Sequence, residues 1–462
     1  MTDTTPRPQP SELRQDGDRI ALSLQQEFLR AMDHGDGNGP FGPYYHIVGG
    51  WRLHGPLDLR ILRGALNDVV ARHEGLRTAI VLDETGVYQR VRPPAAPELV
   101  VRDLPADGDR ERIAEQFACD IEAGPFGTDE YPSMRMVLGR FDRQDAVLVM
   151  VAHHTMVDGW SAQVVMRDLA EHYAARAQRR RPVLPPARQP REYTAWQRAE
   201  AERPATAAAR AFWRTSLHGA RMLTIPTDRP RPAEGDFRTG WHRFLLGEEF
   251  GRATATVAAR TRSSSFMVLL AAYLMHLRDR TGQTDLVLPT FTPGRSPGWT
   301  EDVVGSFYNF LPLRVDVEGC ADLLAVVARV RSACLAAYVH EIPFVQLSEE
   351  APELMSPLSE PDGAASVFQV VQSPFMMTDW QAGDLRFTAM RRRLLSASVG
   401  SQLPDGLLWS LEPRPGGLIL GKIGYTTNLF DEESVVRMAE EFRVVLRDTV
   451  VTLADTLVDP VS

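Results

Sequence analysis

Apolar and polar residues fall into distinct blocks along this chain, and the clearest apolar block is the run Val147–Ala152. A continuous apolar run that polar residues end abruptly predicts a buried strand. After a short turn, apolar residues recur at helical spacing within residues 162–176, at Val165, Leu169 and Tyr173. This spacing predicts a helix with one buried face, so the chain is expected to pass from strand through turn to helix.

The second half of the chain repeats this kind of unit. Residues 266–280 predict an apolar helix, which the serines at 263–265 would cap and Gly282 would end. A predicted strand follows over residues 285–291. Between the halves, residues 179–190 are basic and rich in proline, which is typical of a linker. The pattern therefore predicts two halves, each built from strands and helices.

Two histidines end the central apolar run, and an Asp-Gly pair follows in the turn. An imidazole titrates near neutral pH, so His154 is a candidate general base. Asp158 would hold the turn by pairing with an arginine, and Gly159 would let a ligand approach the backbone closely. The alternative is structural, with His153 and His154 bonded to backbone carbonyls and Asp158 acting as an ordinary helix cap. The full His-His-x-x-x-Asp-Gly pattern favours the functional interpretation.

This segment, residues 153–159, resembles the signature of the condensation domains of nonribosomal peptide synthetases, within the chloramphenicol acetyltransferase superfamily. Other segments from about Leu22 to Leu453 fit the same family. Glu341 departs from it by standing where the family has glutamine, and the seventh motif lacks the arginine and asparagine expected before Phe368. The matching flanking segments are 22–29, 72–78, 193–197, 304–314, 340–344 and 425–431.

The resemblance implies an α/β fold of two chloramphenicol acetyltransferase-like lobes, each an α+β two-layer sandwich, arranged as a V-shaped pseudo-dimer with a tunnel between them. The expected boundaries are a flexible N-terminal lead at 1–18 and an N-terminal lobe at 19–180 that carries the His-His motif. A linker at 181–205 and a C-terminal lobe at 206–462 would follow.

The resemblance also assigns expected roles around the turn. His154, His153, Asp158 and Gly159 would form the catalytic group, and Arg77 or Arg314 would be the charge partner of Asp158. Two further residues, Trp160 and Ser161, would support the site. Three would lie along the tunnel, namely Asn309, Tyr308 and Ser306. For Asn309 the alternative is an ordinary turn amide, because a buried asparagine must find hydrogen-bond partners in either case.

The composition of the chain restricts the kinds of partner that we expect it to bind. The 462 residues carry a net charge of −9, which does not favour binding to nucleic acid or to an anionic membrane. The three cysteines form no metal-ligand cluster, so no metal is expected. Residues 266–277, the longest helical apolar stretch, are too few to span a bilayer, and the polar N-terminus does not resemble a signal peptide. A cytoplasmic, monomeric protein is the expectation.

The expected function is acyl transfer. By resemblance, the phosphopantetheine arm of a peptidyl carrier protein would deliver an aminoacyl or acyl thioester in trans to a free-standing enzyme that holds no permanent cofactor. The acceptor would be a small molecule. Overall the chain looks most like the condensation enzymes of enediyne antibiotic pathways, which favours an alcohol on an enediyne core and ester formation. Amide formation on an amine and a non-catalytic recruitment module are the alternatives.

Overall fold

The computed structural model describes residues 19–457 except 34, 36, 38, 85, 233–237, 297, 372, 374, 376 and 403–405. The predicted lead at 1–18 therefore lies outside the described residues. The chain forms two compact units. Unit 1 comprises residues 1–206, 294–308 and 373–391, and unit 2 comprises residues 207–293, 309–372 and 392–462. This division differs from two contiguous lobes, because two segments from the second half of the chain belong to unit 1.

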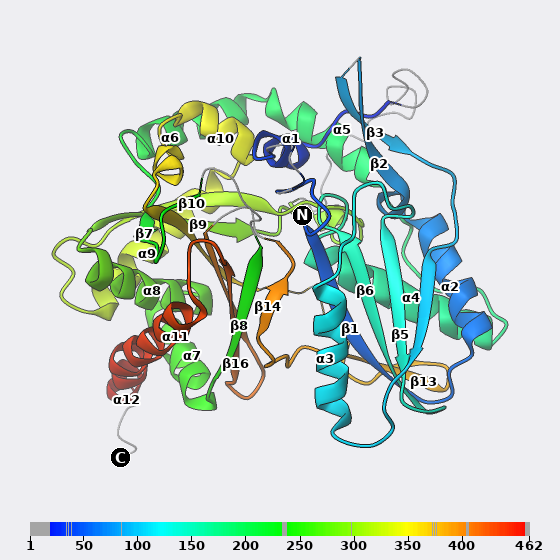
Figure 1. The fold of residues 1–462 in the computed structure, drawn as a ribbon. Coiled ribbons are helices and arrows are strands. Elements are labelled where there is room, and N and C mark those ends of the chain that lie inside the picture. The colour runs from blue at the N-terminus through cyan, green and yellow to red at the C-terminus, as the bar shows by residue number, and fades with distance from the viewer. Residues whose placement is uncertain are drawn as a thin grey trace. The chain divides into compact units, whose positions relative to one another are not determined.

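Unit 1 is built on a mixed six-stranded sheet with the order β12-β13-β1-β6-β5-β4 (Figure 1). Every neighbouring pair is antiparallel except β4 and β5, which run parallel. Its strands are β1 (His46–His54), β4 (Glu98–Asp103), β5 (Met134–Arg140), β6 (Asp145–His153), β12 (Trp380–Ala382) and β13 (Leu385–Ala389), and β2 (Thr78–Asp83) and β3 (Gly86–Val91) form a separate hairpin. Its helices are α1 (Leu24–Ala31), α2 (Leu59–Arg72), η1 (Glu74–Arg77), α3 (Arg110–Glu122), α4 (Gly159–Ala177), α5 (Pro190–Ala201) and η2 (Gly298–Thr300).

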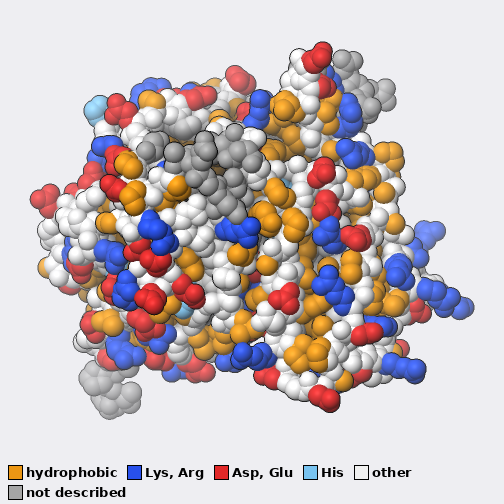
Figure 2. Space-filling model, in the orientation of Figure 1, with side chains coloured by type: hydrophobic (Ala, Val, Ile, Leu, Met, Phe, Trp, Pro, Cys, Tyr) orange, Lys and Arg blue, Asp and Glu red, His pale blue; other side chains and the backbone are white. Residues whose placement is uncertain are grey.

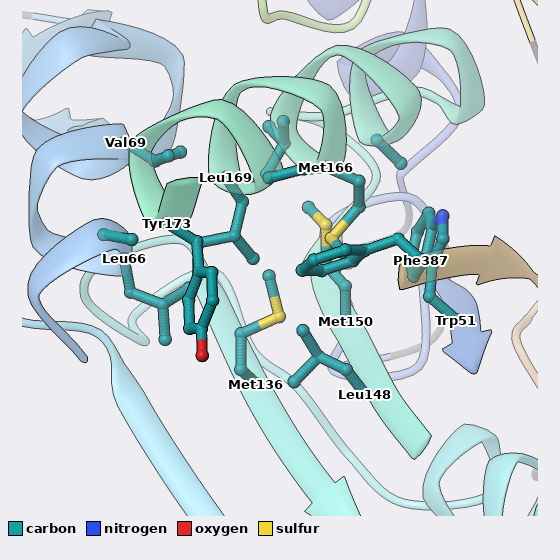
Figure 3. Packing of buried hydrophobic residues seen from close by; sticks show 14 of the residues in the cluster. Trp51, Leu66, Val69, Met136, Leu148, Met150, Met166, Leu169, Tyr173 and Phe387 are labelled. Atoms are coloured by element: carbon teal, nitrogen blue, oxygen red, sulfur yellow. The ribbon is translucent and has the colours of Figure 1, made fainter. Parts of the chain in front are cut away.

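The core of unit 1 lies between this sheet and the helices α2 and α4. Met136, Leu148 and Met150 from β5 and β6 meet Leu66 of α2 and Met166 of α4 (Figure 3). A smaller cluster lies between the other face of the sheet and α3. All residues of β6 are buried, as the unbroken apolar run predicts. Because α4 packs on the sheet directly after β6, the turn between them is held at both ends.

Unit 2 contains a second mixed six-stranded sheet, with the order β14-β8-β16-β15-β11-β7. Its strands are β7 (Thr224–Pro226), β8 (Thr239–Leu246), β11 (Gly363–Val370), β14 (Ala397–Gly400), β15 (Leu407–Pro413) and β16 (Ile419–Thr426), and β9 (Asp285–Thr292) pairs with β10 (Asn309–Asp316). Its helices are α6 (Pro204–Ser216, which begins in unit 1), α7 (Glu248–Thr261), α8 (Ser265–Thr281), α9 (Leu323–Val339), α10 (Phe344–Glu350), η3 (Ser356–Ser359), α11 (Glu432–Leu446), η4 (Arg447–Val451) and α12 (Thr452–Leu457).

Local sequence signals account for several boundaries. Ser264 caps α8 by accepting a hydrogen bond from the Met267 backbone N–H, and Gly282 ends the helix with φ +73°. In the predicted linker at 181–205, residues 190–201 form α5. Pro190 stands near the helix start, where its missing N–H costs nothing, and Gln189 forms a capping box with Glu192. Proline in this segment therefore marks a helix start as well as a connection.

Candidate active site

The two histidines of the motif occupy different environments at the end of β6. His153 is the last residue of the strand and lies opposite His46 in β1. The next residue, His154, has left the sheet, although its backbone N–H still donates to the Tyr45 carbonyl at 2.9 Å. Successive side chains of a strand point to opposite faces, so neighbouring histidines separate into different surroundings.

His153 is a structural residue of unit 1. Its side chain is buried, with Nε2 3.1 Å from the Gly42 carbonyl oxygen and Nδ1 2.7 Å from the Thr155 hydroxyl. The carbonyl can only accept, so Nε2 carries the proton and Nδ1 accepts from the hydroxyl. Burial lowers the pKa of His153 to about 4, and the imidazole is neutral at pH 7. Both ring nitrogens are occupied, which fits the structural alternative for this residue.

His154 is half-buried and has one ring nitrogen fixed. Nδ1 lies 3.1 Å from the Val157 carbonyl oxygen, so Nδ1 carries the proton and Nε2 of the neutral ring carries the lone pair. Burial is the main cause that lowers the pKa of His154 below its usual value, with nearby Asp158 opposing it. The neutral form therefore prevails at pH 7. This is the state that a general base requires.

Asp158 is both a helix cap and half of a buried ion pair. Its Oδ1 accepts from the Ser161 backbone N–H at 2.7 Å, as the N-cap of α4. Arg295 Nη2 lies 2.8 Å from Oδ1 and 3.0 Å from Oδ2. Only 6% of the Asp158 side chain and 2% of the Arg295 side chain are exposed. The predicted capping and the predicted ion pair are therefore both present in the structure.

The expected partners of Asp158 were wrong. Arg77 donates to the Arg92 carbonyl at 2.8 Å and lies 3.8 Å from Glu74. Arg314 lies in unit 2, where it forms a half-exposed bidentate pair with Asp285. Asp285 is the first residue of β9. Arg314 lies in β10, opposite Val287 of β9, so the two side chains meet on the same strand pair. The arginine that pairs with Asp158 instead follows β9, in the segment 294–308 that belongs to unit 1.

Segment 294–308 is bonded along its length to the start of α4. The Ser161 hydroxyl donates to the Gly305 carbonyl at 2.6 Å and accepts from the Gly305 N–H at 3.0 Å. Trp160 Nε1 donates to the Glu301 carbonyl at 2.9 Å. Asp158 Oδ2 accepts from the Phe307 N–H at 3.1 Å. The expected support of the turn by Trp160 and Ser161 stays a prediction for function, but both side chains do hold this segment.

A glycine makes the fold of this segment possible. Gly294 has φ +61°, and a Cβ atom there would lie 1.7 Å from the Phe307 carbonyl oxygen. A side chain is thus excluded both by conformation and by space. The chain turns at Gly294 so that Arg295 enters unit 1, where it also donates to the carbonyls of Thr300 at 2.7 Å and Val303 at 2.8 Å.

The three tunnel candidates separate between the two units. Tyr308 lies in unit 1 against the His154 ring, with centroids 4.9 Å apart. Ser306 is buried in unit 1 and lines a small cavity with Gln26 and Thr78. Asn309 is buried in unit 2, where Oδ1 accepts from the Phe344 N–H and Nδ2 donates to the Ile342 carbonyl. Asn309 is the first residue of strand β10, so it is not a turn residue, and its amide is bonded within unit 2. Its place along a tunnel stays a prediction.

Gly159 occupies the first position of α4 and is exposed. The backbone N–H groups in the first turn of a helix have no acceptor within the helix, and the helix dipole adds positive potential there. These groups suit a developing negative charge.

The site residues that sequence reasoning missed are Tyr45, whose ring stacks on His154 with a centroid separation of 5.2 Å, and Arg295. An apolar strand followed by Pro-Gly-Arg at residues 293–295 was the available signal for Arg295.

Within the described residues, no group of three or more His, Cys, Asp or Glu side chains is placed to hold a metal ion. Over the same residues, no single helix is long and apolar enough to cross a membrane, although the bent pair α9 and α10 passes by length and composition. In the view of Figure 2, acidic and basic side chains are interspersed over the visible surface.

The fold and the His-His-x-x-x-Asp-Gly turn define a class. The condensation domain family matches residues 38–459, and the chain belongs to that family, as the sequence resemblance predicted. Condensation domains transfer acyl and aminoacyl groups in nonribosomal peptide synthesis. The chain is 35% identical over 455 residues to a probable non-canonical nonribosomal peptide synthetase, CymA, of Salinispora arenicola, and 31% identical over 446 residues to a component of the linear gramicidin synthase of Brevibacillus parabrevis. Each alignment covers 94% of this chain but only 6% and 8% of those synthetases.

Solved structures include relatives of similar length. SgcC5 of Streptomyces globisporus, crystallised with (R)-(-)-1-(2-naphthyl)-1,2-ethanediol and sucrose, is 43% identical, with a TM-score of 0.90 over 93% of this chain and 98% of that chain. The X-domain from teicoplanin biosynthesis is 26% identical, with a TM-score of 0.77 over 96% of both chains. The predicted fold of chloramphenicol acetyltransferase-like α/β lobes is confirmed by these likenesses. The V-shaped arrangement and the tunnel stay predictions.

Proposed function

We propose that this chain transfers an aminoacyl group from the phosphopantetheine thioester of a carrier protein, acting in trans, to an alcohol, and so forms an ester. The observation that carries the choice of an alcohol is the 43% identity, over nearly the whole chain, to SgcC5, which was crystallised with a diol. The shared family supports acyl transfer from a carrier-bound thioester in general.

In this proposal His154 acts as general base through Nε2. Nε2 removes the hydroxyl proton as the acceptor oxygen attacks the thioester carbonyl carbon. The tetrahedral intermediate then collapses, the carbon–sulfur bond breaks, and the phosphopantetheine sulfur takes the proton from the imidazolium. The lone pair is on Nε2 because Nδ1 donates to the Val157 carbonyl. A well-placed base contributes about 10²–10⁴-fold in rate.

The negative charge of the tetrahedral intermediate requires donors. The exposed start of α4 offers backbone N–H groups, that of Gly159 among them, and the positive end of the helix dipole. A Cβ atom at Gly159 would have no described protein atom within 4 Å, so the space beside this residue is open to a ligand. Asp158 and Arg295 act indirectly, because their ion pair fixes the cap of α4 and thereby the direction of these N–H groups.

His153 has a different part in the proposal. Its ring nitrogens are both bonded within unit 1, and its low pKa of about 4 keeps it neutral. It therefore supports the strand end from which His154 projects and does not exchange protons with substrate. Of the residues expected to form the catalytic group, we place only His154 and the Gly159 backbone in contact with the reacting atoms.

Two other functions have a specific observation in their favour. Amide formation on an amine acceptor fits the synthetases that share 31–35% identity with this chain. A recruitment module without catalysis fits the likeness to the X-domain from teicoplanin biosynthesis, which has also been crystallised in complex with OxyB. That identity is 26% against 43% for SgcC5, and His154 has the geometry of a base, so we favour the enzyme.

The acceptor class can be narrowed by the same reasoning. We propose an aromatic or enediyne-core vicinal diol as the physiological acceptor, and a monomeric enzyme that meets its carrier in trans. The support for the acceptor is the 43% identity to SgcC5, which was crystallised with a vicinal diol on a naphthyl ring. The carrier's phosphopantetheine arm belongs to the donor substrate, so the enzyme itself needs no resident cofactor in this account.

The test is an acyl-transfer assay with a phosphopantetheinylated carrier protein loaded with each of a panel of amino acids. The acceptors are 1-(2-naphthyl)-1,2-ethanediol and 2-amino-1-(2-naphthyl)ethanol, which present a hydroxyl or an amine on the same skeleton. Mass spectrometry should show the ester from the diol. Amide from the amino alcohol alone would establish the amine alternative, and product from neither acceptor with any loaded carrier would contradict the proposal.

A further inference from the structure

Two tyrosine rings contact the His154 imidazole, and neither tyrosine belongs to the His-His motif. Tyr45 directly precedes β1, and its ring stacks on the imidazole with a centroid separation of 5.2 Å and an interplanar angle of 22°. Its carbonyl also accepts the His154 backbone N–H at 2.9 Å. Tyr45 therefore contacts both the backbone and the ring of the candidate base.

Tyr308, the last residue of segment 294–308, contacts the same imidazole. The ring centroids lie 4.9 Å apart at an angle of 46°. The position of Tyr308 is set by its neighbour Phe307, whose backbone N–H donates to Asp158 at 3.1 Å and whose ring packs on Tyr193 at 4.3 Å. The Asp158 ion pair and the Tyr308 ring are thus connected through one peptide unit.

The two tyrosines are also bonded to each other. Their hydroxyl oxygens are 2.5 Å apart, so one phenol donates to the other beside the imidazole. Packing alone would need only the two rings, which phenylalanine also supplies. The hydroxyl bond additionally ties the chain before β1 to segment 294–308, two stretches that are 263 residues apart. All three rings belong to unit 1.

We propose that Tyr45 and Tyr308 are positioning residues that hold the His154 imidazole in one rotamer, with the hydroxyl–hydroxyl bond keeping the two rings in place. This inference rests on the proposed role of His154 as base. With Nδ1 fixed on the Val157 carbonyl and both tyrosine rings in contact with the imidazole, rotation of the imidazole would break a hydrogen bond and displace an aromatic ring. Nε2 therefore points in one direction, as proton transfer requires.

The arrangement has a measurable electrostatic consequence. Burial is the main cause that lowers the pKa of His154, and the Tyr45 and Tyr308 rings are part of its surroundings. Asp158 and the hydrogen bond to the Val157 carbonyl raise the pKa of His154, and the nearby His46 lowers it. His153 is a further titratable neighbour, and its own low pKa keeps it neutral. Removing the Tyr308 ring would admit water to the imidazole, so the pKa of His154 should rise toward its ordinary value of about 6.5.

The variants are Tyr45→Phe, Tyr308→Phe, the double Phe variant and Tyr308→Ala, with Tyr44→Phe as the matched control. Tyr44 is a half-buried neighbour of Tyr45. Each single Phe variant should lower kcat about 5–10-fold with KM changed less than about threefold, since a displaced base slows the reaction without weakening binding. The double variant should lose no more than either single, because all three lack the same bond. Tyr308→Ala should lose about 100-fold, and Tyr44→Phe should match the wild type.

A second readout does not depend on activity. In protein with ¹⁵N-labelled histidine, the His154 signals, assigned by their loss in His154→Ala, report the tautomer and the pKa. Tyr308→Ala should raise the pKa of His154 and populate both tautomers of its ring, whereas Tyr308→Phe should leave the pKa of His154 close to its wild-type value. An unchanged His154 pKa and tautomer in folded Tyr308→Ala, or Phe losses that add in the double variant, would overturn the positioning role. Absence of transfer by the wild type would instead count against the proposed function and leave this spectroscopic test decisive.

Discussion

Replacing Arg295 by methionine is the sharpest perturbation that the site offers. Methionine keeps much of the volume of the side chain but removes its charge and its donors. In the native protein, the guanidinium donates to both oxygens of Asp158, to the Ser161 hydroxyl at 2.7 Å, and to two backbone carbonyls. The variant leaves a carboxylate with 6% side-chain exposure without its counter-charge.

The expected loss follows from that burial. Removing one partner of a buried ion pair costs about 3–5 kcal/mol, because the remaining charge stays out of water without compensation. For a domain of about this size, 1 kcal/mol shifts the melting temperature by roughly 2–4 °C, so unit 1 should melt on the order of 10 °C lower. The backbone N–H of Ser161 and that of Phe307 still solvate Asp158, which places the estimate at the lower half of the range.

Arg314→Met is the matched control. Arg314 also pairs with one aspartate, Asp285, but 32% and 48% of these side chains are exposed. Exposed pairs contribute about 0–1 kcal/mol, so this variant should melt within a few degrees of the wild type. The comparison separates burial from the mere presence of an Arg–Asp pair.

The assay is differential scanning calorimetry of both variants, of Asp158→Asn and of the Asp158→Asn/Arg295→Met double variant at pH 7. The double variant should recover part of the sum of the single losses, because it contains no unpaired buried charge. If Arg295→Met melts as high as Arg314→Met, the buried pair does not hold unit 1 together and the reasoning is refuted.

Three further outcomes are expected. The pKa of His153 is about 4 in the folded protein and about 6.5 in the unfolded chain, so its contribution to stability is complete above pH 6.5 and is lost as the pH falls toward 4, by roughly 3 kcal/mol in all. In urea titrations, the free energy of unfolding of His153→Gln should therefore depend less on pH than that of the wild type. Equal pH dependence of the two proteins would show that His153 is not the origin of the effect. Asn309→Ala should lower the free energy of unfolding by about 2 kcal/mol, because the Phe344 N–H and the Ile342 carbonyl lose their partner. Ser306→Ala should change it by less than about 0.5 kcal/mol, because the Ser306 hydroxyl has no hydrogen-bond partner among the described residues. The same titrations measure both variants, and a larger loss for Ser306→Ala would contradict these contacts. Asp158→Ala should impair folding or the start of α4, and recovery of a folded, fully active variant would refute the structural role of Asp158.

The strand–turn–helix around the motif could be predicted because its signals are local. The apolar run fixes β6, and the N-cap and the helical spacing fix α4. The limits of helix α8 were equally readable from Ser264 and Gly282. Such signals depend on residues within a few positions, so tertiary structure did not change their meaning.

The partner of Asp158 could not be derived in the same way. Arg295 lies 137 residues further along, and its approach depends on a left-handed glycine and on which unit the segment joins. Arg77 and Arg314 were plausible because both stand in family-like segments, yet local acceptors engage them instead. Charge alone does not specify a pair when a chain holds 51 basic side chains.

The aromatic surroundings of His154 were equally hidden. Tyr45 and Tyr308 come from opposite halves of the chain, and neither position carries a pattern that distinguishes a ring against a base from a ring in the core. The Tyr193–Trp196 pair illustrates the ambiguity, since it packs in the core with Phe307, as its composition alone suggested.

The pH dependence of single-turnover product formation, with an aminoacyl carrier protein and the naphthyl diol, tests the central claim most directly. If Nε2 of His154 is the base, the wild-type rate should hold steady from neutral pH downward and fall only below pH 6.5, because burial lowers the pKa of this imidazole. His154→Ala should be about 10²–10⁴-fold slower and should lack that acidic limb. A variant that stays within about tenfold of the wild type and keeps the same limb would contradict the account.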